Sequence, residues 1–226
     1  MVEVSGRSGT ERRERLERAR LYLVIEAAPG GRPAAEIVGP ALEGGVDVVQ
    51  LREKHAPAEA ITTAGSELRR LCHRHGGLLV VNDRADLALA CGADGVHLGQ
   101  EDEGPEAARA LVGPELLVGV STHSPSQIEA AERSTADYLG VGPVHVTATK
   151  PGVPAVGLEL VRHAAAHAGK PFFAIGGIDA GNAVEAAGAG ARRVAVVRTI
   201  RDAPDPRDAA AALLDALDRA LALAAR

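Results

Sequence analysis

Aromatic residues are almost missing from this chain of 226 residues, which has no Trp and only 2% Phe and Tyr. Hydrophobic residues nevertheless make up 46% of the sequence, which is enough for a large core. We therefore expect an aliphatic core of Val, Leu, Ile and Ala, the composition that suits the interior of a parallel barrel. The shortage of aromatics also argues against single-stranded nucleic-acid binding, which relies on aromatic stacking platforms.

Cysteine is scarce as well, and the two thiols, Cys72 and Cys91, lack the spacing of a metal site. We expect both to be free and buried in a cytoplasmic protein. The net charge is −5, so no global positive field attracts a polyanion. No apolar run reaches the roughly 20 residues of a membrane span, and the N-terminus has no apolar signal-peptide region. We expect neither nucleic-acid nor membrane partners.

The N-terminal segment, residues 1–18, is polar and rich in Gly, Ser, Arg and Glu. Its positive charges are interleaved with Glu, a pattern typical of a solvated segment. We therefore expect a flexible charged arm, with at most a short helix at its end. The remaining residues, 19–226, are expected to form one catalytic domain.

Short apolar runs recur along the rest of the chain and do not alternate with polar residues, as in strands buried on both faces. Segments rich in Ala and Leu with helical spacing separate these runs. The alternation predicts an α/β fold, a single (β/α)8 TIM barrel with parallel strands. The first run is not followed by the G-x-G-x-x-G turn of an open dinucleotide-binding sheet. The expected strands are residues 21–25, 47–51, 78–81, 95–98, 116–120, 137–141, 172–175 and 193–197. The expected helices include residues 57–75, 105–111, 125–133, 158–168, 180–189 and 206–225.

A weak internal repeat supports a closed barrel. Each copy has small residues at a helix exit, then a polar residue, then a strand. The copies are centred on Asp47, Asp94 and Asp137, with an altered fourth copy at residues 190–194.

Polar residues stand at the ends of several apolar runs, where a parallel barrel builds its active site. The segment Gln50-Leu51-Arg52-Glu53-Lys54 follows one run. A period of two predicts that Gln50, Arg52 and Lys54 point the same way into the barrel mouth. Arg offers a planar fork for phosphate oxygens and Lys a mobile charge. A solvated strand end is the alternative.

Two carboxylates follow adjacent expected strands. Asp83, after Asn82, follows the third run, and Asp102 follows the fourth. Carboxylates, phosphate oxygens and water are the ligands that Mg²⁺ prefers, so we expect a magnesium site there. The alternatives are an ordinary turn at Asn82-Asp83 and an exposed acid at Asp102.

A second set of groups suits a phosphate. Thr147-Ala148-Thr149-Lys150 lies in the loop after the sixth run, and Lys150 could neutralise a leaving group. Gly176-Gly177 and Val197-Arg198 end the seventh and eighth runs, where barrels commonly bind phosphate through backbone amides. An ordinary polar loop is the alternative for residues 147–150.

Ser121 and His123 could suggest a nucleophile pair, but no orienting acid accompanies them. We expect Ser121 to hydrogen-bond a phosphate instead. For His97, within the fourth run, a core or supporting role is favoured over that of a catalytic base.

Taken together, these segments resemble the thiamine phosphate synthase family. The resemblance runs from about residue 21 to about residue 200, through VQLREK, VNDRADLALACGADGVHLGQED, VGVSTHS, YLGVGPVHVTATKPG, GLE and FFAIGGID. It implies a (β/α)8 barrel that joins 4-amino-5-hydroxymethyl-2-methylpyrimidine diphosphate to 4-methyl-5-hydroxyethylthiazole phosphate. The implied products are thiamine monophosphate and pyrophosphate.

The resemblance also implies site roles. The residues for the pyrimidine diphosphate would be Gln50, Leu51, Arg52, Glu53, Lys54, Asn82, Ser121 and Lys150. Those for the thiazole phosphate would be Thr147, Ala148, Thr149, Gly177, Val197 and Arg198. The Mg²⁺ cofactor would bind Asp83 and Asp102, and the leaving group would be stabilised by Arg52, Lys54 and Lys150. One departure is Arg198, which stands where the family usually has a serine.

Two other functions fit parts of the pattern. A thiazole tautomerase on the same barrel would bind the thiazole phosphate without a diphosphate grip or a metal. A non-catalytic barrel would bind phosphate ligands only. The joint presence of Gln50, Asp83, Asp102 and Lys150 favours the synthase. The expected partners are small-molecule substrates, and a homo-oligomer is compatible with the sequence.

Overall fold

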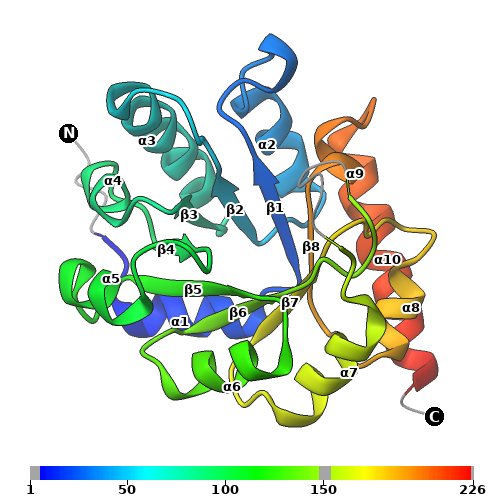
Figure 1. Ribbon diagram of the computed structural model, residues 1–226. Helices are drawn as coiled ribbons and strands as arrows, with labels where there is room; N and C mark the ends of the chain where they lie inside the picture. Colours follow the sequence, from blue (N-terminus) through cyan, green and yellow to red (C-terminus); the bar gives the residue numbers. More distant parts are fainter. Residues whose placement is uncertain (1–5, 148–153, 225–226) are drawn as a thin grey trace.

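The computed structural model describes residues 6–147 and 154–224, and it contains a closed barrel of eight parallel strands in the order β1 to β8. This confirms the predicted TIM barrel, with the strands in the centre and the helices around them (Figure 1). The strands are β1 (Leu21–Ile25), β2 (Val48–Leu51), β3 (Leu78–Asn82), β4 (Gly95–Leu98), β5 (Leu117–Thr122), β6 (Tyr138–Val141), β7 (Phe172–Ile175) and β8 (Val194–Val196).

The helices follow the expected alternation, and each expected helix lies within three residues of its predicted bounds. In the part of the chain that the structure describes, no helix is both long and apolar enough to cross a membrane. The helices are α1 (Gly9–Arg18), α2 (Ala35–Glu43), α3 (Ala58–Arg74), α4 (Ala85–Ala90), α5 (Pro105–Val112), α6 (Pro125–Arg133), α7 (Gly157–His167), α8 (Ala183–Gly188), α9 (Arg198–Arg201) and α10 (Pro206–Ala224), with a 3-10 turn η1 (Pro29–Gly31).

The core has two layers, because successive side chains of a strand point to opposite faces. The outer layer, between strands and helices, is aliphatic as expected and includes both free, buried cysteines. The inner layer differs, since Tyr22, Tyr138 and Phe173 meet there. Phe173 stands edge-on to both tyrosines, with ring centroids 5.1 Å from Tyr22 and 5.9 Å from Tyr138. The expectation of an aliphatic core is therefore wrong for the barrel interior.

Gly119 on β5 makes room for this aromatic layer. A Cβ at this position would lie 2.1 Å from Cζ of Tyr138, closer than atoms can approach. The glycine thus lets a ring from β6 enter the middle of the barrel.

Helix α1 closes the N-terminal end of the barrel, which corrects the expectation of a flexible arm. Arg12 Nε donates to Asp94 at 3.1 Å, and Arg13 Nε donates to Asp137 at 2.8 Å. Asp94 is fully buried, and Leu16 of the helix packs into the inner layer. The cations Arg12 and Arg13 therefore face a charged barrel end, while the exposed charges of α1 face solvent.

The internal repeat has a structural cause. Each aspartate before a strand accepts a backbone N–H near the start of a neighbouring strand. Asp47 accepts from Leu21, Asp94 from Leu79 and Asp137 from Val118, at 3.1, 2.9 and 2.8 Å respectively. In the altered fourth copy the charge is reversed, and Arg193 pairs with Glu17 of α1.

Asp94 should be a major source of stability. Burial alone would raise its pKa, but the hydrogen bonds from His73 and the Leu79 N–H oppose burial. With the positive charges of His73 and Arg7, they bring the pKa of Asp94 below the ordinary 3.8. The carboxylate thus stabilises the folded state above about pH 4, and this contribution is lost as the pH falls through the lowered value.

We predict that Asp94→Asn lowers the free energy of unfolding by about 3 kcal/mol at neutral pH, because it leaves buried cations without a counter-charge. Urea unfolding would measure this, and the difference from wild type should shrink below about pH 4. Asp218→Asn is the control, since Asp218 forms an exposed ion pair with Arg20 and should cost less than about 1 kcal/mol. Equal losses in the two variants would contradict the assignment.

Candidate active site

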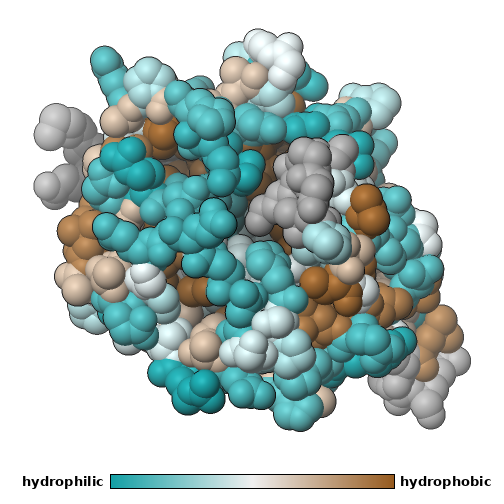
Figure 2. All heavy atoms as spheres, in the orientation of Figure 1, coloured by the Kyte–Doolittle hydropathy of each residue, from teal (hydrophilic) through white to brown (hydrophobic). Residues whose placement is uncertain are grey.

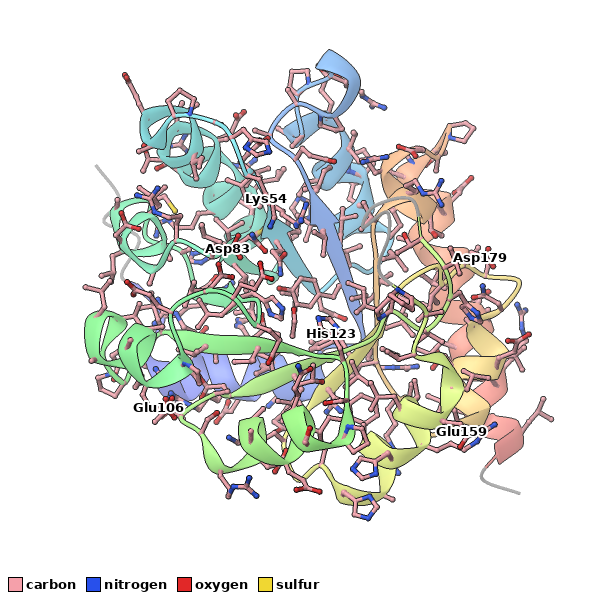
Figure 3. The ribbon with its side chains drawn as sticks, viewed as in Figure 1. Lys54, Asp83, Glu106, His123, Glu159 and Asp179 are labelled. Carbon is pink, nitrogen blue, oxygen red and sulfur yellow. The ribbon has the colours of Figure 1, made fainter. Side chains whose placement is uncertain are left out.

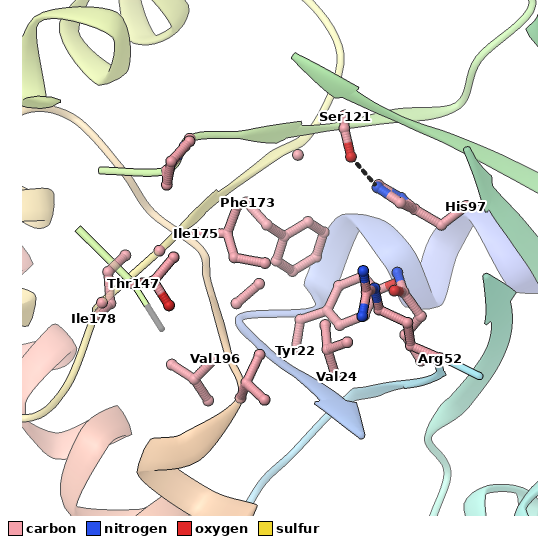
Figure 4. Close-up of a pocket in the computed structure, with 18 of the residues that line it drawn as sticks. Tyr22, Val24, Arg52, His97, Ser121, Thr147, Phe173, Ile175, Ile178 and Val196 are labelled. Carbon is pink, nitrogen blue, oxygen red and sulfur yellow. Dashed lines mark hydrogen bonds between the residues drawn. The ribbon is translucent and has the colours of Figure 1, made fainter. Parts of the chain in front are cut away.

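A cavity opens at the carboxyl ends of the strands, with about 1130 Å³ of space including its mouth. The face of the molecule seen in Figure 2 is mostly hydrophilic, whereas the cavity floor is formed by aromatic and aliphatic side chains (Figure 4). The predicted site residues that line the cavity are Gln50, Arg52, Asn82, Ser121, Thr147, Gly177, Val197 and Arg198.

The segment after β2 divides into cavity and supporting residues. Gln50 and Arg52 line the cavity, as the period of two predicts. Strand β2 ends at Leu51, so Lys54 lies beyond it, exposed and close enough to Asp83 to interact electrostatically (Figure 3).

Two residues of this segment have other contacts. Leu51 is 1% exposed and packs in the outer core layer, so its side chain points away from the cavity. Glu53 Oε1 accepts the N–H of Ala27 at 2.6 Å and ties the loop after β1 to the loop after β2. These two side chains therefore do not line the cavity, and their place in the predicted pyrimidine-diphosphate segment stays a prediction.

Asp83 and Asp102 do come together. Asp83 has a positive φ of 62°, which turns the chain directly after β3. Its N–H donates to the carbonyl of His97 on β4 at 2.8 Å. Asp102 Oδ2 accepts the N–H of Gly99 at 2.7 Å after β4. The two carboxyl groups are in hydrogen-bond contact.

This contact changes the acidity of Asp83. Burial, together with the hydrogen bond and negative charge of Asp102, raises the pKa of Asp83 to about 6. The positive charges of Lys54 and Arg52 oppose it. Two acids held this close repel each other when both are ionised, and together they supply two carboxylates that could hold a cation.

Asn82 and Ser121 flank the same cavity. Asn82 ends β3 and is 8% exposed, and among the described residues its amide Nδ2 has no hydrogen-bond partner. Ser121 Oγ lies 3.0 Å from Nε2 of His97 (Figure 4). A buried amide without a partner costs free energy, so Asn82 is set up for a ligand.

His97 and Ser121 clarify the nucleophile question. Ser121 pairs with His97 and not with His123, and Nδ1 of His97 bonds the hydroxyl of Tyr138 at 3.2 Å. No carboxylate orients His97 through these bonds. The arrangement supports the expected supporting role for His97.

The cavity-lining residues that sequence reasoning missed include Tyr22, Tyr138 and His123. His123 Nδ1 donates to the carbonyl of Gly142 across the mouth. Its position two residues after Ser121 was a usable signal, because alternate residues share a face. The meeting of the two tyrosines had no local signal.

The opposite wall of the cavity is built from backbone. Gly176 and Gly177 have φ values of 110° and 65°, and a Cβ on Gly177 would lie 2.8 Å from Cβ of His145. The glycine pair thus lets the loops after β6 and β7 pack closely. Arg198 is exposed at the first position of α9. The predicted residues Ala148, Thr149 and Lys150 lie outside the described residues.

Comparisons with known proteins place this site in a family. The family model described as Thiamine monophosphate synthase matches residues 21–200. The chain is similar to the Thiamine-phosphate synthase of Saccharopolyspora erythraea, with 52% identity over 216 residues, 92% of this chain and 97% of that protein. The chain belongs to the thiamine monophosphate synthase family.

Two further relatives agree. A Thiamine-phosphate synthase of Gloeobacter violaceus is 53% identical over 212 residues. The aligned region covers 94% of this chain and 61% of that protein. The structure of Thiamine phosphate pyrophosphorylase from Pyrococcus furiosus has a TM-score of 0.82 at 36% identity, and covers 92% of this chain and 98% of that chain. The family's activity is that of a transferase which releases diphosphate.

The acid pair leads to a prediction for this family member. Because the pKa of Asp83 is raised to about 6, the metal-free protein loses stability as the pH rises from about 4 through about 6. Asp83→Asn should therefore raise the free energy of unfolding at pH 7 by about 1 kcal/mol, an amount discounted for solvent screening of this half-buried site.

Urea unfolding of the metal-free protein at several pH values would check this, and the gain should vanish near pH 4. Asp86→Asn is the control, because Asp86 pairs with Arg84 at the surface and its pKa is lowered. A loss of stability in Asp83→Asn at pH 7 would contradict the account.

Proposed function

We propose that this chain joins 4-amino-5-hydroxymethyl-2-methylpyrimidine diphosphate to 4-methyl-5-(2-phosphooxyethyl)thiazole, giving thiamine monophosphate and pyrophosphate. The observation that carries the proposal is a cavity lined by amides and a cation, with a second cation and two paired carboxylates close to that lining cation. Asn82, Gln50 and Arg52 line that cavity, and Asp83 with Asp102 lies next to Arg52 and Lys54. A neutral aromatic ring with a charged diphosphate tail matches this division into amides and charges.

The pyrimidine would stand on the aromatic floor. Tyr22 and Phe173 line the bottom of the cavity and give an apolar ring surface. Asn82 Nδ2, which has no hydrogen-bond partner in the described chain, would donate to the ring or its substituents. Gln50 and Ser121 would bind the remaining polar edge.

The acid pair fits Mg²⁺ as a shared site. Within residues 6–147 and 154–224 no group of three or more His, Cys, Asp or Glu side chains could hold a metal ion. Asp83 and Asp102 supply two carboxylates in contact, and Mg²⁺ commonly takes one or two carboxylates and completes its shell with phosphate oxygens and water. A Mg²⁺ held there would neutralise charge on the diphosphate.

Departure of pyrophosphate would be the demanding step. Negative charge grows on the leaving oxygens, and Arg52 and Lys54 are placed to stabilise it. The electron-rich aminopyrimidine supports the resulting cation, and the thiazole nitrogen captures it. No protein nucleophile is required, in agreement with the pairing of Ser121 with His97.

The thiazole phosphate would bind at the β7 and β8 side of the cavity, where barrels commonly hold phosphate. Thr147, Gly177 and the backbone of Val197 and Arg198 line this side. The Arg198 side chain is exposed at the rim and adds a cation that a serine would not supply. Lys150, Thr149 and Ala148 remain predictions for the same ligands.

The acid pair also separates this function from its rivals. A thiazole tautomerase or a phosphate-binding barrel without activity has no use for two carboxylates held in contact beside Arg52 and Lys54.

Location in the cytoplasm fits the two buried free thiols, and a homo-oligomer stays a prediction.

The test is pyrophosphate release with both substrates present, with and without Mg²⁺. We expect release only when both substrates and the metal are supplied. Asp102→Ala should reduce kcat at least about a hundredfold, because charge on the leaving group loses its metal.

Glu103→Ala is a matched control, since Glu103 is an exposed acid next to Asp102 in sequence and should release pyrophosphate at the wild-type rate. Release that is unaffected by Mg²⁺, or equal in Asp102→Ala and wild type, would refute the proposed metal site. Binding of the thiazole phosphate without any pyrophosphate release would favour the tautomerase or the binding barrel.

A further inference from the structure

Five polar side chains form an unbroken chain of hydrogen bonds across the cavity floor. Gln50 Nε2 donates to the hydroxyl of Tyr22 at 2.8 Å, and the hydroxyls of Tyr22 and Tyr138 are 3.0 Å apart. The hydroxyl of Tyr138 lies 3.2 Å from Nδ1 of His97, and Nε2 of His97 lies 3.0 Å from Ser121 Oγ. The last bond is drawn in Figure 4. The chain begins on β2, crosses β1, β6 and β4, and ends on β5.

The middle of this chain is buried at the cavity floor. Tyr22 is 3% exposed and Tyr138 is 1% exposed, and the ring of Phe173 packs edge-on against both. Burial raises the pKa of both tyrosines, so both hydroxyls keep their hydrogens. Each hydroxyl therefore has one hydrogen to donate. Because both hydroxyls are buried, they bond to the neighbouring polar side chains of this chain of hydrogen bonds.

These hydrogens give the chain a direction. If Gln50 Nε2 donates to Tyr22, the hydrogen of Tyr22 goes to Tyr138, and that of Tyr138 goes to His97 Nδ1. Neutral His97 then carries its hydrogen on Nε2 and donates it to Ser121. Ser121 is left with its own O–H for a ligand, while Gln50 presents its carbonyl oxygen.

Rotating the amide of Gln50 reverses every bond. Its oxygen then accepts from Tyr22, Tyr22 accepts from Tyr138, and Tyr138 accepts from Nδ1–H of His97. Ser121 now donates to Nε2 and presents only lone pairs, while Gln50 presents its NH₂ group. In both arrangements one end of the chain is a donor and the other is an acceptor.

We propose that Tyr22 and Tyr138 are positioning residues that couple the hydrogen-bonding sense of Gln50 to that of Ser121 across the cavity. The substrate side of this inference rests on the proposed function. An aminopyrimidine carries an amino donor beside a ring-nitrogen acceptor, so opposite senses at the two ends fit its polar edge. A ring with two like groups would leave one end of the chain mismatched and cost free energy.

The direct test reads the tautomer of His97 in the substrate-free protein. Gln50→Glu places a carboxylate at the start of the chain, and a carboxylate only accepts. The chain should reverse, and His97 should carry its hydrogen on Nδ1 instead of Nε2. Nitrogen NMR of histidine-labelled protein at one mildly alkaline pH would report this, with the His97 signals assigned by their loss in His97→Gln.

A second variant cuts the chain. In Gln50→Glu/Tyr22→Phe the tyrosine hydroxyl is gone, so His97 should return to the Nε2–H form. Phe173→Leu is the packing control, because Phe173 touches both tyrosines through its ring alone, and it should keep the wild-type tautomer. The same tautomer in Gln50→Glu and in Gln50→Glu/Tyr22→Phe, or a changed tautomer in Phe173→Leu, would overturn the proposal.

Kinetics test the link to the substrate separately. Tyr22→Phe should raise KM for the pyrimidine diphosphate about tenfold, the loss of one well-aligned hydrogen bond, with KM for the thiazole phosphate unchanged. Equal rises in both KM values would overturn the positioning role. Absence of turnover in the wild type would refute the proposed function, while the tautomer measurement would still decide the coupling.

Discussion

Closure of eight parallel strands around three aromatic rings is the constraint on which the rest of this structure depends. The rings of Tyr22, Tyr138 and Phe173 fill the barrel where aliphatic side chains would otherwise meet, and they form part of the floor of the cavity. The tyrosine hydroxyls would be costly there without partners, so they bond each other, Gln50 and His97. The same tyrosines therefore pack the core and orient the polar residues of the site.

The two ends of the barrel differ in how their charged groups are paired. At the N-terminal end, opposite charges are paired, as between Arg12 and Asp94, and the pairs are buried under α1. At the carboxyl end, Asp83 and Asp102 are like charges in contact, and Asn82 is buried without a partner in the described chain. The stabilising ion pairs therefore lie at the N-terminal end of the barrel. The like charges and the unpartnered amide lie at the carboxyl end, where barrels bind their substrates.

Much of this was predictable from the sequence. Strands buried on both faces leave non-alternating apolar runs, so the eight strands and the barrel follow from the pattern. Residues at strand ends, such as Gln50 and Asp83, could be found because parallel strands bring their ends together. Leu51 and Glu53 belong to the same segment as Gln50 but do not line the cavity, because adjacent residues of a strand face opposite ways and Glu53 lies in the loop that follows.

Other features depend on contacts that local patterns do not encode. The meeting of Tyr22 with Tyr138 joins residues 116 positions apart and depends on how β1 and β6 face each other in the closed barrel. Alternating Arg and Glu in α1 read the same whether the helix faces water or the charged end of a barrel. Family membership, in contrast, rests on comparison, because 52% identity to a Thiamine-phosphate synthase extends over 92% of the chain.

The most direct measurement is a crystal structure of the protein with thiamine monophosphate, pyrophosphate and Mg²⁺. The account predicts the metal between Asp83 and Asp102, with pyrophosphate oxygens completing its shell. The aminopyrimidine should stand on the floor formed by Tyr22 and Phe173, with a hydrogen bond from Asn82 Nδ2. A metal bound elsewhere, or a pyrimidine that leaves Asn82 without a partner, would contradict it.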